Sequence, residues 1–372
     1  MEITKEQLNF LQIFDHCKDK SGKLTDKIHI KLSGTIVRFT QLSGSLKSFK
    51  ELDVSGQNNL EDFECIYSTQ KFIELVRSSN TIQITKNGIS FGSKSKYNFE
   101  SLDITYPDLI EFLNLKSLPP EEVFTLKDLG MSYFCKDFTG TDRFDYVAFQ
   151  SNHFASSDHK SVACITPTSN NFSYEVDNDG DEITKIFIPS TIISLFEKYA
   201  LKEIEINSYS SKGFWSFNLD GCLCIVPIQT CPLPNIVNGS LSQAYNHKDY
   251  IVVNRKALSS VVKRMKIMDD DKNGRLRLTI SDKELLIENS RSNKSSESIE
   301  CTISDTSVIS KVGDSKTSII LSSDILQKII STFEEEELFI YVPTDPSNFS
   351  TVRFEDKNHI IKIIHILFEE GS

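Results

Sequence analysis

Ser157, Asp158 and His159 carry the three side-chain types of a hydrolytic triad, one directly after the other. In such a triad a serine attacks the substrate, a histidine takes its proton, and an aspartate orients the histidine. Because neighbouring residues of a strand point to opposite faces of a sheet, consecutive residues cannot place all three groups on one side. The spacing therefore argues against hydrolysis, and we predict no catalytic residue.

Two other groups have metal-ligand side chains. Cys222 and Cys224 share one face of an expected strand, but no second Cys or His pair stands at a distance typical of zinc sites. Asp177, Asp179 and Asp181 imitate the start of a calcium loop, but the glycine is misplaced and no glutamate follows at the required distance. No glycine-rich phosphate loop precedes a helix. We therefore expect no metal, no cofactor and no ATP hydrolysis by the chain itself.

The elements that must hold these residues belong to a repeated unit of strand, helix, strand, turn and strand. The clearest copy runs from Cys65 to Phe91, where Ser68 and Thr69 are good helix N-caps and Asn87-Gly88 is a strong hairpin turn. Copies begin near residues 2, 65, 123, 186, 251 and 319. Six copies spaced 58 to 68 residues apart indicate duplication and predict a repeat-built architecture. In the two weaker copies we expect helices from Glu2 to about Lys18 and from Val123 to about Phe138.

Paired repeats would give three domains of about 124 residues. The periodic pattern lapses at 112–122, which holds a Pro pair, and at 232–246, so the predicted domains are residues 1–116, 121–240 and 246–372. The composition, with 39% hydrophobic and 25% charged residues, is that of an ordinary globular protein. No apolar run reaches the ~20 residues of a membrane helix, and the start does not resemble a signal peptide. The eight cysteines lie mostly in apolar segments, which predicts reduced thiols in a cytoplasmic protein.

The formal charge of −11 argues against a protein that coats nucleic acid with its whole surface, because phosphate affinity comes from Lys and Arg. The cations gather instead on the expected helices. The helix that begins at Arg255 has no acidic residue before Asp269, and Leu258, Val261, Val262 and Met265 form its apolar stripe. A solvated helix face is the alternative interpretation. If the repeats place all helices on one side of the sheets, these cations line a common surface.

Four segments carry a resemblance to a known family. In the first domain, 67–72 (YSTQKF) resembles a strand-to-helix step written PARKF, and 99–109 (FESLDITYPDL) resembles a segment that ends in FP(D/N)L. In the second, 155–164 (ASSDHKSVAC) resembles ATDGHRLAV, and 231–237 (CPLPNIV) resembles FPDYRRV. In order and spacing, these motifs resemble those of the bacterial-type DNA polymerase sliding clamp, the beta subunit of the replicative polymerase, or of a phage counterpart.

The resemblance implies an α+β protein of three similar clamp domains, each made of two β-α-β-β-β units. Two chains would assemble head to tail into a ring with helices inside and sheets outside. Such a ring is a non-catalytic processivity factor for DNA replication: it encircles duplex DNA without sequence preference and tethers the polymerase and clamp loader through short linear motifs. The alternatives are a clamp-fold scaffold, for example phage-encoded, that tethers transcription or recombination proteins, and a repeat-built enzyme with a site between domains.

The resemblance also implies three sets of site residues. The DNA-facing set is Lys18, Lys20, Lys23, Lys71, Arg77, Lys127, Lys136, Arg255, Lys263 and Lys266. The hydrophobic peptide-binding groove would be formed by Tyr146, Ser157, His159, Lys160, Ser161, Val162, Pro232, Ile236, Val237, Ile363, His365, Ile366 and Leu367. The dimer interface would contain Lys94, Lys96, Tyr97, Phe99, Ile267, Met268, Glu297 and Glu300.

Overall fold

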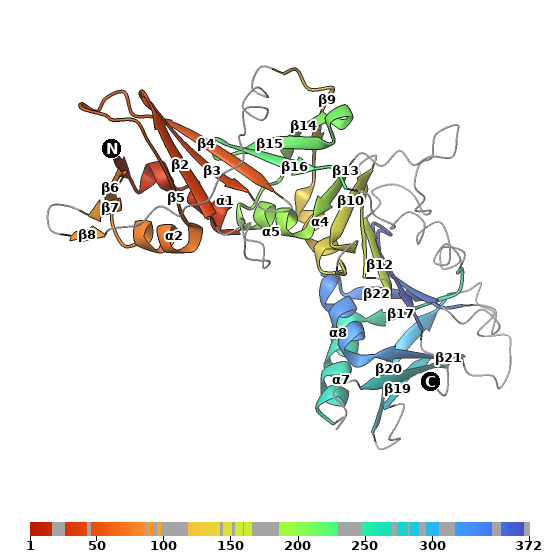
Figure 1. Ribbon diagram of the computed structural model, residues 1–372. Coiled ribbons are helices and arrows are strands. Elements are labelled where there is room, and N and C mark those ends of the chain that lie inside the picture. Colours follow the sequence, from red (N-terminus) through yellow and green to blue (C-terminus); the bar gives the residue numbers. More distant parts are fainter. Residues whose placement is uncertain are drawn as a thin grey trace. The chain divides into compact units, whose positions relative to one another are not determined.

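The computed structural model of the chain (Figure 1) describes residues 1–16, 27–42, 46–86, 88–91, 95–97, 118–141, 144–150, 153–158, 160–165, 186–229, 247–268, 274–281, 283–289, 295–304, 317–343 and 351–367. The chain divides into two compact units. The first unit comprises residues 1–129 and 191–229, and the second comprises residues 130–190 and 230–372. Within the described ranges, no helix has the length and apolar character needed to cross a membrane.

Two antiparallel sheets form the first unit. The larger has the strand order β5-β2-β3-β4-β16-β15-β14-β9. Its strands are β2 Lys27–Ser33, β3 Ile36–Leu42, β4 Lys47–Asp53, β5 Phe63–Ser68, β9 Glu122–Leu126, β14 Ile204–Tyr209, β15 Phe214–Leu219 and β16 Cys222–Pro227. The smaller has the order β1-β6-β7-β8, with β1 Glu2–Thr4, β6 Thr81–Thr85, β7 Gly88–Phe91 and β8 Ser95–Tyr97.

One long sheet dominates the second unit, in the order β13-β10-β11-β12-β24-β23-β22-β17-β20-β19-β18-β21. Its first strands are β10 Tyr146–Gln150, β11 His153–Ser157, β12 Ser161–Ile165 and β13 Ile186–Pro189. The others are β17 Tyr250–Asn254, β18 Arg275–Ile280, β19 Glu284–Asn289, β20 Ser296–Ile303, β21 Thr317–Ser322, β22 Glu337–Tyr341, β23 Thr351–Glu355 and β24 Ile361–Ile366.

The described strands fall into six sets of four, and each described α-helix leads from one set into another. The helices are α1 Leu11–His16, α2 Thr69–Arg77, α4 Leu129–Lys136, α5 Ser190–Lys198, α7 Arg255–Ile267 and α8 Ser323–Thr332. Two short 3₁₀ turns, η1 Glu6–Leu8 and η4 Ser210–Lys212, are also among the described elements. The repeated order of strand, helix and strand that the sequence predicted is thereby confirmed.

The large sheets are continuous because sets from different repeats pair edge to edge. In the first unit β4 pairs with β16, which places Ser48 opposite Cys224. In the second unit β12 pairs with β24, which places Ser161 opposite His365. The segment 121–240 therefore contributes β9 and β14–β16 to one sheet and β10–β13 to another. The structure divides into two compact units, and the three domains expected from the sequence stay a prediction.

The helix expected from Glu2 to Lys18 is wrong at its start. Glu2–Thr4 form a strand that pairs with β6, and Ile3 is fully buried opposite Ile82. Likewise Val123 lies in β9, which pairs with β14, so α4 begins only at Leu129. In both places hydrogen bonds to a strand about 80 residues away in sequence outweigh a local helical pattern, which is a weak predictor on its own.

In the second unit, α7 and α8 pack side by side and cover one face of the sheet (Figure 1). The apolar stripe predicted for α7 is confirmed, because Leu258, Val261, Val262 and Met265 are all buried in its core. The α8 side chains Leu326, Ile329 and Ile330 join the same core. Burial of each such side chain contributes roughly 1.5–3 kcal/mol, so the two helices are held firmly and their outer faces are fixed in direction.

Candidate DNA-facing, peptide-binding and ring-contact surfaces

Helix α7 begins with a side-chain cap at Asn254, whose Oδ1 accepts a hydrogen bond from the Ala257 N–H at 3.0 Å. The side chains of its basic residues point in three directions: toward α8, toward β20, and away from the core. Arg255 and Lys266 point toward α8: the Arg255 Nε donates to the Glu335 carbonyl at 2.7 Å, and Lys266 forms an ion pair with Asp324. Both residues were expected to face DNA, but each is engaged within its own chain.

The other basic residues of α7 face elsewhere. Arg264 turns toward β20 and binds Glu297 through both guanidinium edges, with Nε 2.9 Å from Oε1 and Nη2 2.5 Å from Oε2. The hydrogen bonds from Arg264 hold the pKa of Glu297 below its usual range. Lys256 and Lys263 lie opposite the buried stripe and are exposed. Lys263 was predicted as DNA-facing, whereas Lys256 was not placed in that set.

The remaining predicted DNA-facing residues lie on other helices. In the first unit Lys71 and Arg77 are exposed on α2, and the Arg77 Nη2 lies 2.6 Å from the Asp15 carboxylate of α1. Lys127 is exposed just before α4, and Lys136 is half-buried in its last turn. The residues Lys18, Lys20 and Lys23 lie outside the described residues.

Two strands carry most of the described residues of the predicted groove. The hairpin between β11 and β12 turns at Asp158, whose Oδ1 accepts the N–H groups of Lys160 at 3.0 Å and Ser161 at 2.6 Å. Asp158 therefore shapes a turn and does not orient a catalytic histidine. The Ser157 hydroxyl donates to the Ser161 carbonyl at 2.8 Å. The strand β24 lies against β12, and the residues Ser157, Ser161, Val162, Ile363, His365 and Leu367 are buried while Lys160 is exposed and Tyr146 is half-buried.

These groove residues do not share one face. Ser161, Ile363 and His365 lie on one face of the sheet, the face that packs against the core of the second unit. Val162 and Ser157 lie on the opposite face, because successive strand residues alternate between faces. The second side also holds Lys362, which is 1% exposed and whose pKa is lowered by burial. Sequence reasoning missed Lys362, although a lysine within an apolar strand was the available signal. His159, Pro232, Ile236 and Val237 lie outside the described residues, as does the side chain of Ile366.

A polar pair joins β12 and β24. The Ser161 Oγ and the His365 Nδ1 are hydrogen-bonded at 2.9 Å, and His365 is 2% exposed. Burial lowers the pKa of His365 to about 4, and the neighbouring Asp158 carboxylate opposes this shift only in part. The imidazole is therefore neutral at pH 7, which makes it a hydrogen-bonding part of the sheet and not a charge.

The described sheets end in β1, β5, β8, β9, β13 and β21, each with one strand partner, and two open edges, of β8 and of part of β20, lie at predicted ring-contact residues. In the first unit β8 pairs with β7 alone. In the second unit β20 pairs with β19 through 296–300, but with β17 only through 301–303. The edge of 296–300 that faces away from β19 thus has no strand partner in the described part of the chain. Open edges present unpaired N–H and C=O groups, so they are ready templates for pairing with another chain.

The ring-contact residues predicted near β20 include two exposed apolar side chains. Ile267 and Met268, at the end of α7, are 81% and 66% exposed. Glu300 is exposed and lies directly opposite Glu284 of β19, whereas Glu297 is bound to Arg264. Lys94 and Phe99 lie outside the described residues, and Lys96 and Tyr97 are described only as part of strand β8.

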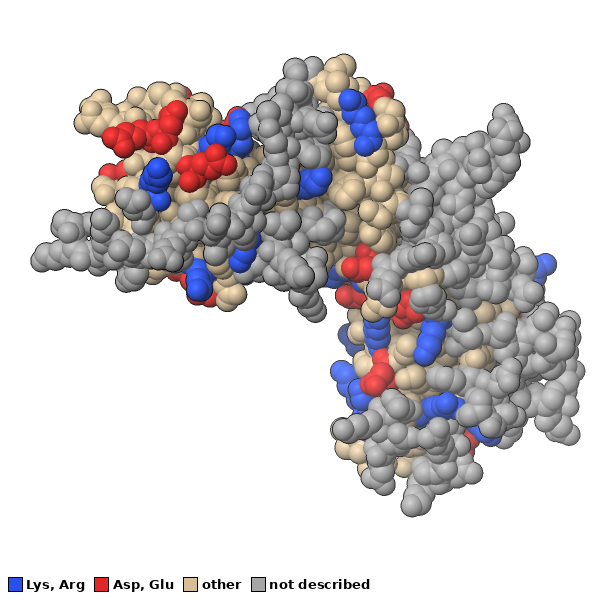
Figure 2. Space-filling model, viewed as in Figure 1, with Lys and Arg blue, Asp and Glu red and all other residues tan. Residues whose placement is uncertain are grey.

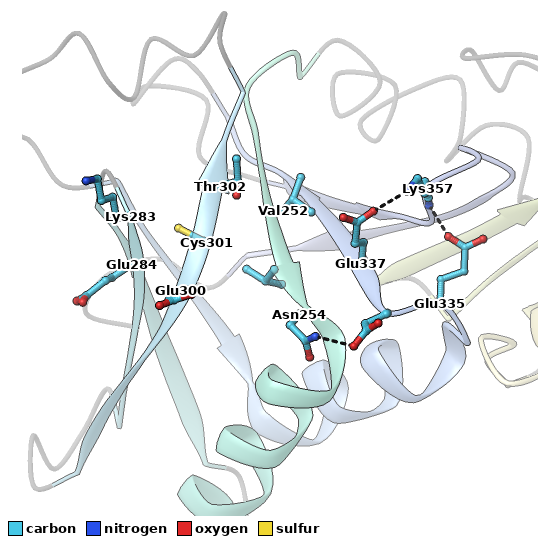
Figure 3. A pocket seen from close by; sticks show the side chains of 12 residues that line it. Val252, Asn254, Lys283, Glu284, Glu300, Cys301, Thr302, Glu335, Glu337 and Lys357 are labelled. Atoms are coloured by element: carbon cyan, nitrogen blue, oxygen red, sulfur yellow. Dashed lines mark hydrogen bonds and ion pairs between the residues drawn. The ribbon is translucent and has the colours of Figure 1, made fainter.

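A hollow of about 900 Å³ opens where β20 leaves β17 (Figure 3). Its lining contains five carboxylates, of Glu284, Glu300, Glu335, Glu336 and Glu337, and two amines, of Lys283 and Lys357. Lys357 is partly neutralised because its Nζ lies 3.0 Å from the Glu337 carboxylate. The hollow is therefore acidic, and it adjoins the open edge of β20.

No protein-family profile matches the chain, and no curated protein matches its sequence. Solved structures do resemble its fold over 99% of its length. A protein assigned as a DNA polymerase III beta subunit from Eubacterium rectale has a TM-score of 0.73 at 12% identity, with 99% of its own chain covered. The DNA polymerase III beta-subunit sliding clamp of Bartonella birtlesii, bound to griselimycin, has a TM-score of 0.71 at 14% identity and 99% coverage. The DNA polymerase III beta subunit of Thermotoga maritima has a TM-score of 0.73 at 10% identity and 98% coverage. The chain has the sliding-clamp fold.

Proposed function

We propose that two copies of this chain with the sliding-clamp fold close head to tail into a ring that encircles duplex DNA. The ring would hold the DNA topologically and act as a non-catalytic processivity factor for a replicative polymerase. Similarity to solved clamps supports the fold. The observation that carries the ring is the pair of open strand edges, β8 in one unit and β20 in the other.

The sheets indicate how those edges would be used. The first large sheet joins two sets of four strands where β4 meets β16, and the second joins two sets where β12 meets β24. Two sets then remain. The set β1-β6-β7-β8 ends in the open edge of β8, and the set β21-β18-β19-β20 is joined to β17 only through 301–303 of β20, which leaves the edge of 296–300 open. Pairing of β8 from one copy with β20 from another would complete a third sheet of eight strands. Such a contact is heterologous, because it joins two different surfaces. It closes into a ring of two copies when the free β20 of one copy also pairs with the free β8 of the other.

Charge and apolar surface at β20 fit this contact. The acidic hollow beside β20 suits the basic sequence around β8, which contains Lys94 and Lys96. Opposite charges across an interface steer association and fix its register. The exposed Ile267 and Met268 would supply the apolar part, since large exposed apolar side chains that lie together commonly mark protein contacts. Glu300 is available to a partner, whereas Glu297 is held by Arg264.

The helices would line the hole of the ring. Sequence-independent binding needs only cations that contact phosphates, and such contacts position a protein without reading bases. The basic helices α2 and α7 can provide them although the chain as a whole is acidic. Short linear motifs of the polymerase and the clamp loader would dock near β11, β12 and β24, where the predicted groove residues cluster.

The test is the solution mass by sedimentation, combined with retention on closed circular and on linearised duplex DNA. A dimer that stays on closed circles and leaves cut ones is the expected result. A dimer that leaves both forms equally would contradict topological binding. A monomer that binds neither would contradict the ring and favour the second candidate, a clamp-fold scaffold, for which the buried Ser161–His365 pair and Lys362 in the predicted groove strands are the supporting observations.

A further inference from the structure

The cations of α7 differ in what they already bind. Arg255 donates to carbonyls at the end of α8, Arg264 holds the Glu297 carboxylate, and Lys266 is paired with Asp324. A cation that is bound to a carboxylate or to backbone carbonyls must share or break that contact before it can bind a phosphate. These three residues are therefore poor candidates for DNA contacts, although all belong to the most basic helix of the chain.

Lys256 and Lys263 are the remaining cations of α7. They are seven residues apart, close to two helical turns, so they lie one above the other on the same face. That face is opposite to the buried stripe, and both side chains are exposed. Ser260 lies between them and is also exposed. The outer crest of α7 thus presents two amines and no described carboxylate.

A third amine stands on the neighbouring helix. The Lys328 Nζ of α8 lies 4.4 Å from the centroid of the Phe138 ring, within the range of a cation–π interaction. Phe138 follows α4 and is fully buried, so the ring is a fixed support. α8 is tied to α7 through the Gln327 Nε2, which donates to the Ser259 Oγ at 3.3 Å. In Figure 2, Lys and Arg side chains lie along the edge of the molecule where Figure 1 places α7 and α8, with Asp and Glu side chains among them.

The geometry points to Lys256, Lys263 and Lys328 as the phosphate-binding residues of the second unit, with Phe138 as a positioning residue that holds Lys328 in place. This inference rests on the proposed function and narrows it to three side chains. Two of them, Lys256 and Lys328, were not in the DNA-facing set expected from the sequence. The occupant is the sugar-phosphate backbone of duplex DNA.

The chemistry of the three groups suits a ring that slides. A lysine ammonium is a compact, strongly hydrated point charge, whereas an arginine fork matches carboxylate or phosphate pairs in a fixed geometry. The two arginines of α7 are both engaged by the protein, whereas the amines of Lys256 and Lys263 are exposed. The cation–π contact orders the Lys328 side chain before DNA arrives, which lowers the entropy lost on binding.

The experiment measures binding of the full-length protein to a short labelled linear duplex by fluorescence anisotropy over a series of salt concentrations. The variant K256M/K263M/K328M removes three charges and keeps three apolar stems, so the Met side chain at 328 still covers Phe138. Because the logarithm of the binding constant falls with the logarithm of salt by about 0.9 per phosphate contact, the slope should decrease by about 2.7. The triple variant K86M/K202M/K212M, at exposed lysines of the first unit outside its α-helices, is the matched control and should keep the wild-type slope.

The role of Phe138 is tested separately. Phe138→Leu keeps an apolar core residue but removes the ring, so binding should weaken two- to threefold while the salt slope stays unchanged, because the Lys328 charge remains. Lys328→Arg keeps the charge and should bind DNA nearly as well as the wild type, whereas Lys328→Met should bind less well. A purely structural role of Lys328 would not predict this difference.

The outcomes separate the two levels of the proposal. If the wild-type protein stays on closed circular DNA but shows no salt-dependent binding to the short linear duplex, the assignment of these residues is wrong and the proposed function stands. If it is retained on neither form, both fail. If it binds and the triple Met variant keeps the wild-type slope, the assignment is wrong and the proposed function stands. A K256M/K263M/K328M variant with lost helical circular dichroism is replaced by the three single variants, each expected to lower the slope by about 0.9.

Discussion

Arg264 of α7 and Glu297 of β20 form an ion pair through both edges of the guanidinium, with Nε and Nη2 at 2.9 and 2.5 Å from the two carboxylate oxygens. The resemblance to clamps placed Glu297 at the ring contact. Within one chain, however, this carboxylate ties the last turns of α7 to the strand beside them. Glu300, three residues on, is exposed on the hollow. The two glutamates therefore have different roles.

Glu297→Gln and Glu300→Lys should separate these roles. We expect Glu297→Gln to leave dimer association within about twofold of wild type, because Arg264 already neutralises that carboxylate. Glu300→Lys should weaken association, because it places a positive charge where a basic strand is expected to dock. Sedimentation at physiological salt measures both. Equal weakening by the two substitutions would mean that the Arg264 pair opens in the ring.

Ile267→Asp with Met268→Asp should convert the proposed dimer into a monomer that remains folded. Both side chains are largely exposed in the single chain, so charges there do not disturb its core. In the ring the same charges would be buried without partners. Ile228→Asp, at a 40% exposed position in the other unit, is the control and should stay dimeric. The measurement is sedimentation together with a thermal melt.

Charge reversal at Lys94 and Lys96 should also weaken the dimer. Lys94 precedes the edge strand β8 in sequence and Lys96 belongs to it. The surface proposed to pair with β8 is acidic. The effect should diminish at high salt, because screening shortens the range of surface charges. If K94E/K96E associates like the wild type in sedimentation, charge complementarity does not contribute to the proposed contact.

Arg255→Met and Lys263→Met should have opposite signatures. Arg255 donates two hydrogen bonds to carbonyls that follow α8, at 2.7 and 3.2 Å, so its loss should lower the melting temperature. Lys263 has an exposed side chain on the crest of α7, so its loss should lower the salt slope of DNA binding and leave the melting temperature nearly unchanged. A larger loss of DNA binding from Arg255→Met than from Lys263→Met would contradict this division.

His365 should make stability fall with acid over a defined range. Its pKa is about 4 in the folded chain and about 6.5 when unfolded, so above pH 6.5 both states are neutral. As the pH falls from 6.5 to about 4, the unfolded chain binds the proton first, and the free energy of unfolding should decrease by about 3 kcal/mol. His29 and His247, whose pKa values burial also lowers, add to the same trend.

The measurement for His365 is urea denaturation at pH 7 and at pH 5, on wild type and on His365→Gln. Glutamine keeps a hydrogen-bonding group beside Ser161 but does not titrate. The loss of stability between the two pH values should therefore be smaller in His365→Gln than in the wild type. The same pH dependence in His365→Gln would assign the effect to other groups.

The repeat, the buried stripe of α7 and the sheet-forming segments were predictable from the sequence, because periodicity directly reports which side chains face a core. The first strand was not. Glu2–Thr4 look helical locally, and they become a strand only through pairing with 81–83. A single sequence gives no access to such distant partners.

The candidate sites show the same limit. The sequence located the basic helix α7 correctly, but it could not tell which of its cations are already occupied. Arg264 meets a carboxylate 33 residues away, and Arg255 meets a carbonyl 80 residues away. Similarly, the predicted groove residues of β12 and β24 divide between two faces, which only the register of the strands reveals.

The open edges of β8 and β20 also bear on how the protein behaves in dilute solution. A dissociated copy exposes two unsatisfied strand edges and an apolar pair at once, which are the features that drive unspecific sheet growth. Closure of the proposed ring would hide all of them. The fraction of chains that expose these edges should thus fall as the total concentration rises above the dissociation constant of the dimer, so a smaller share of a concentrated sample should be open to such growth.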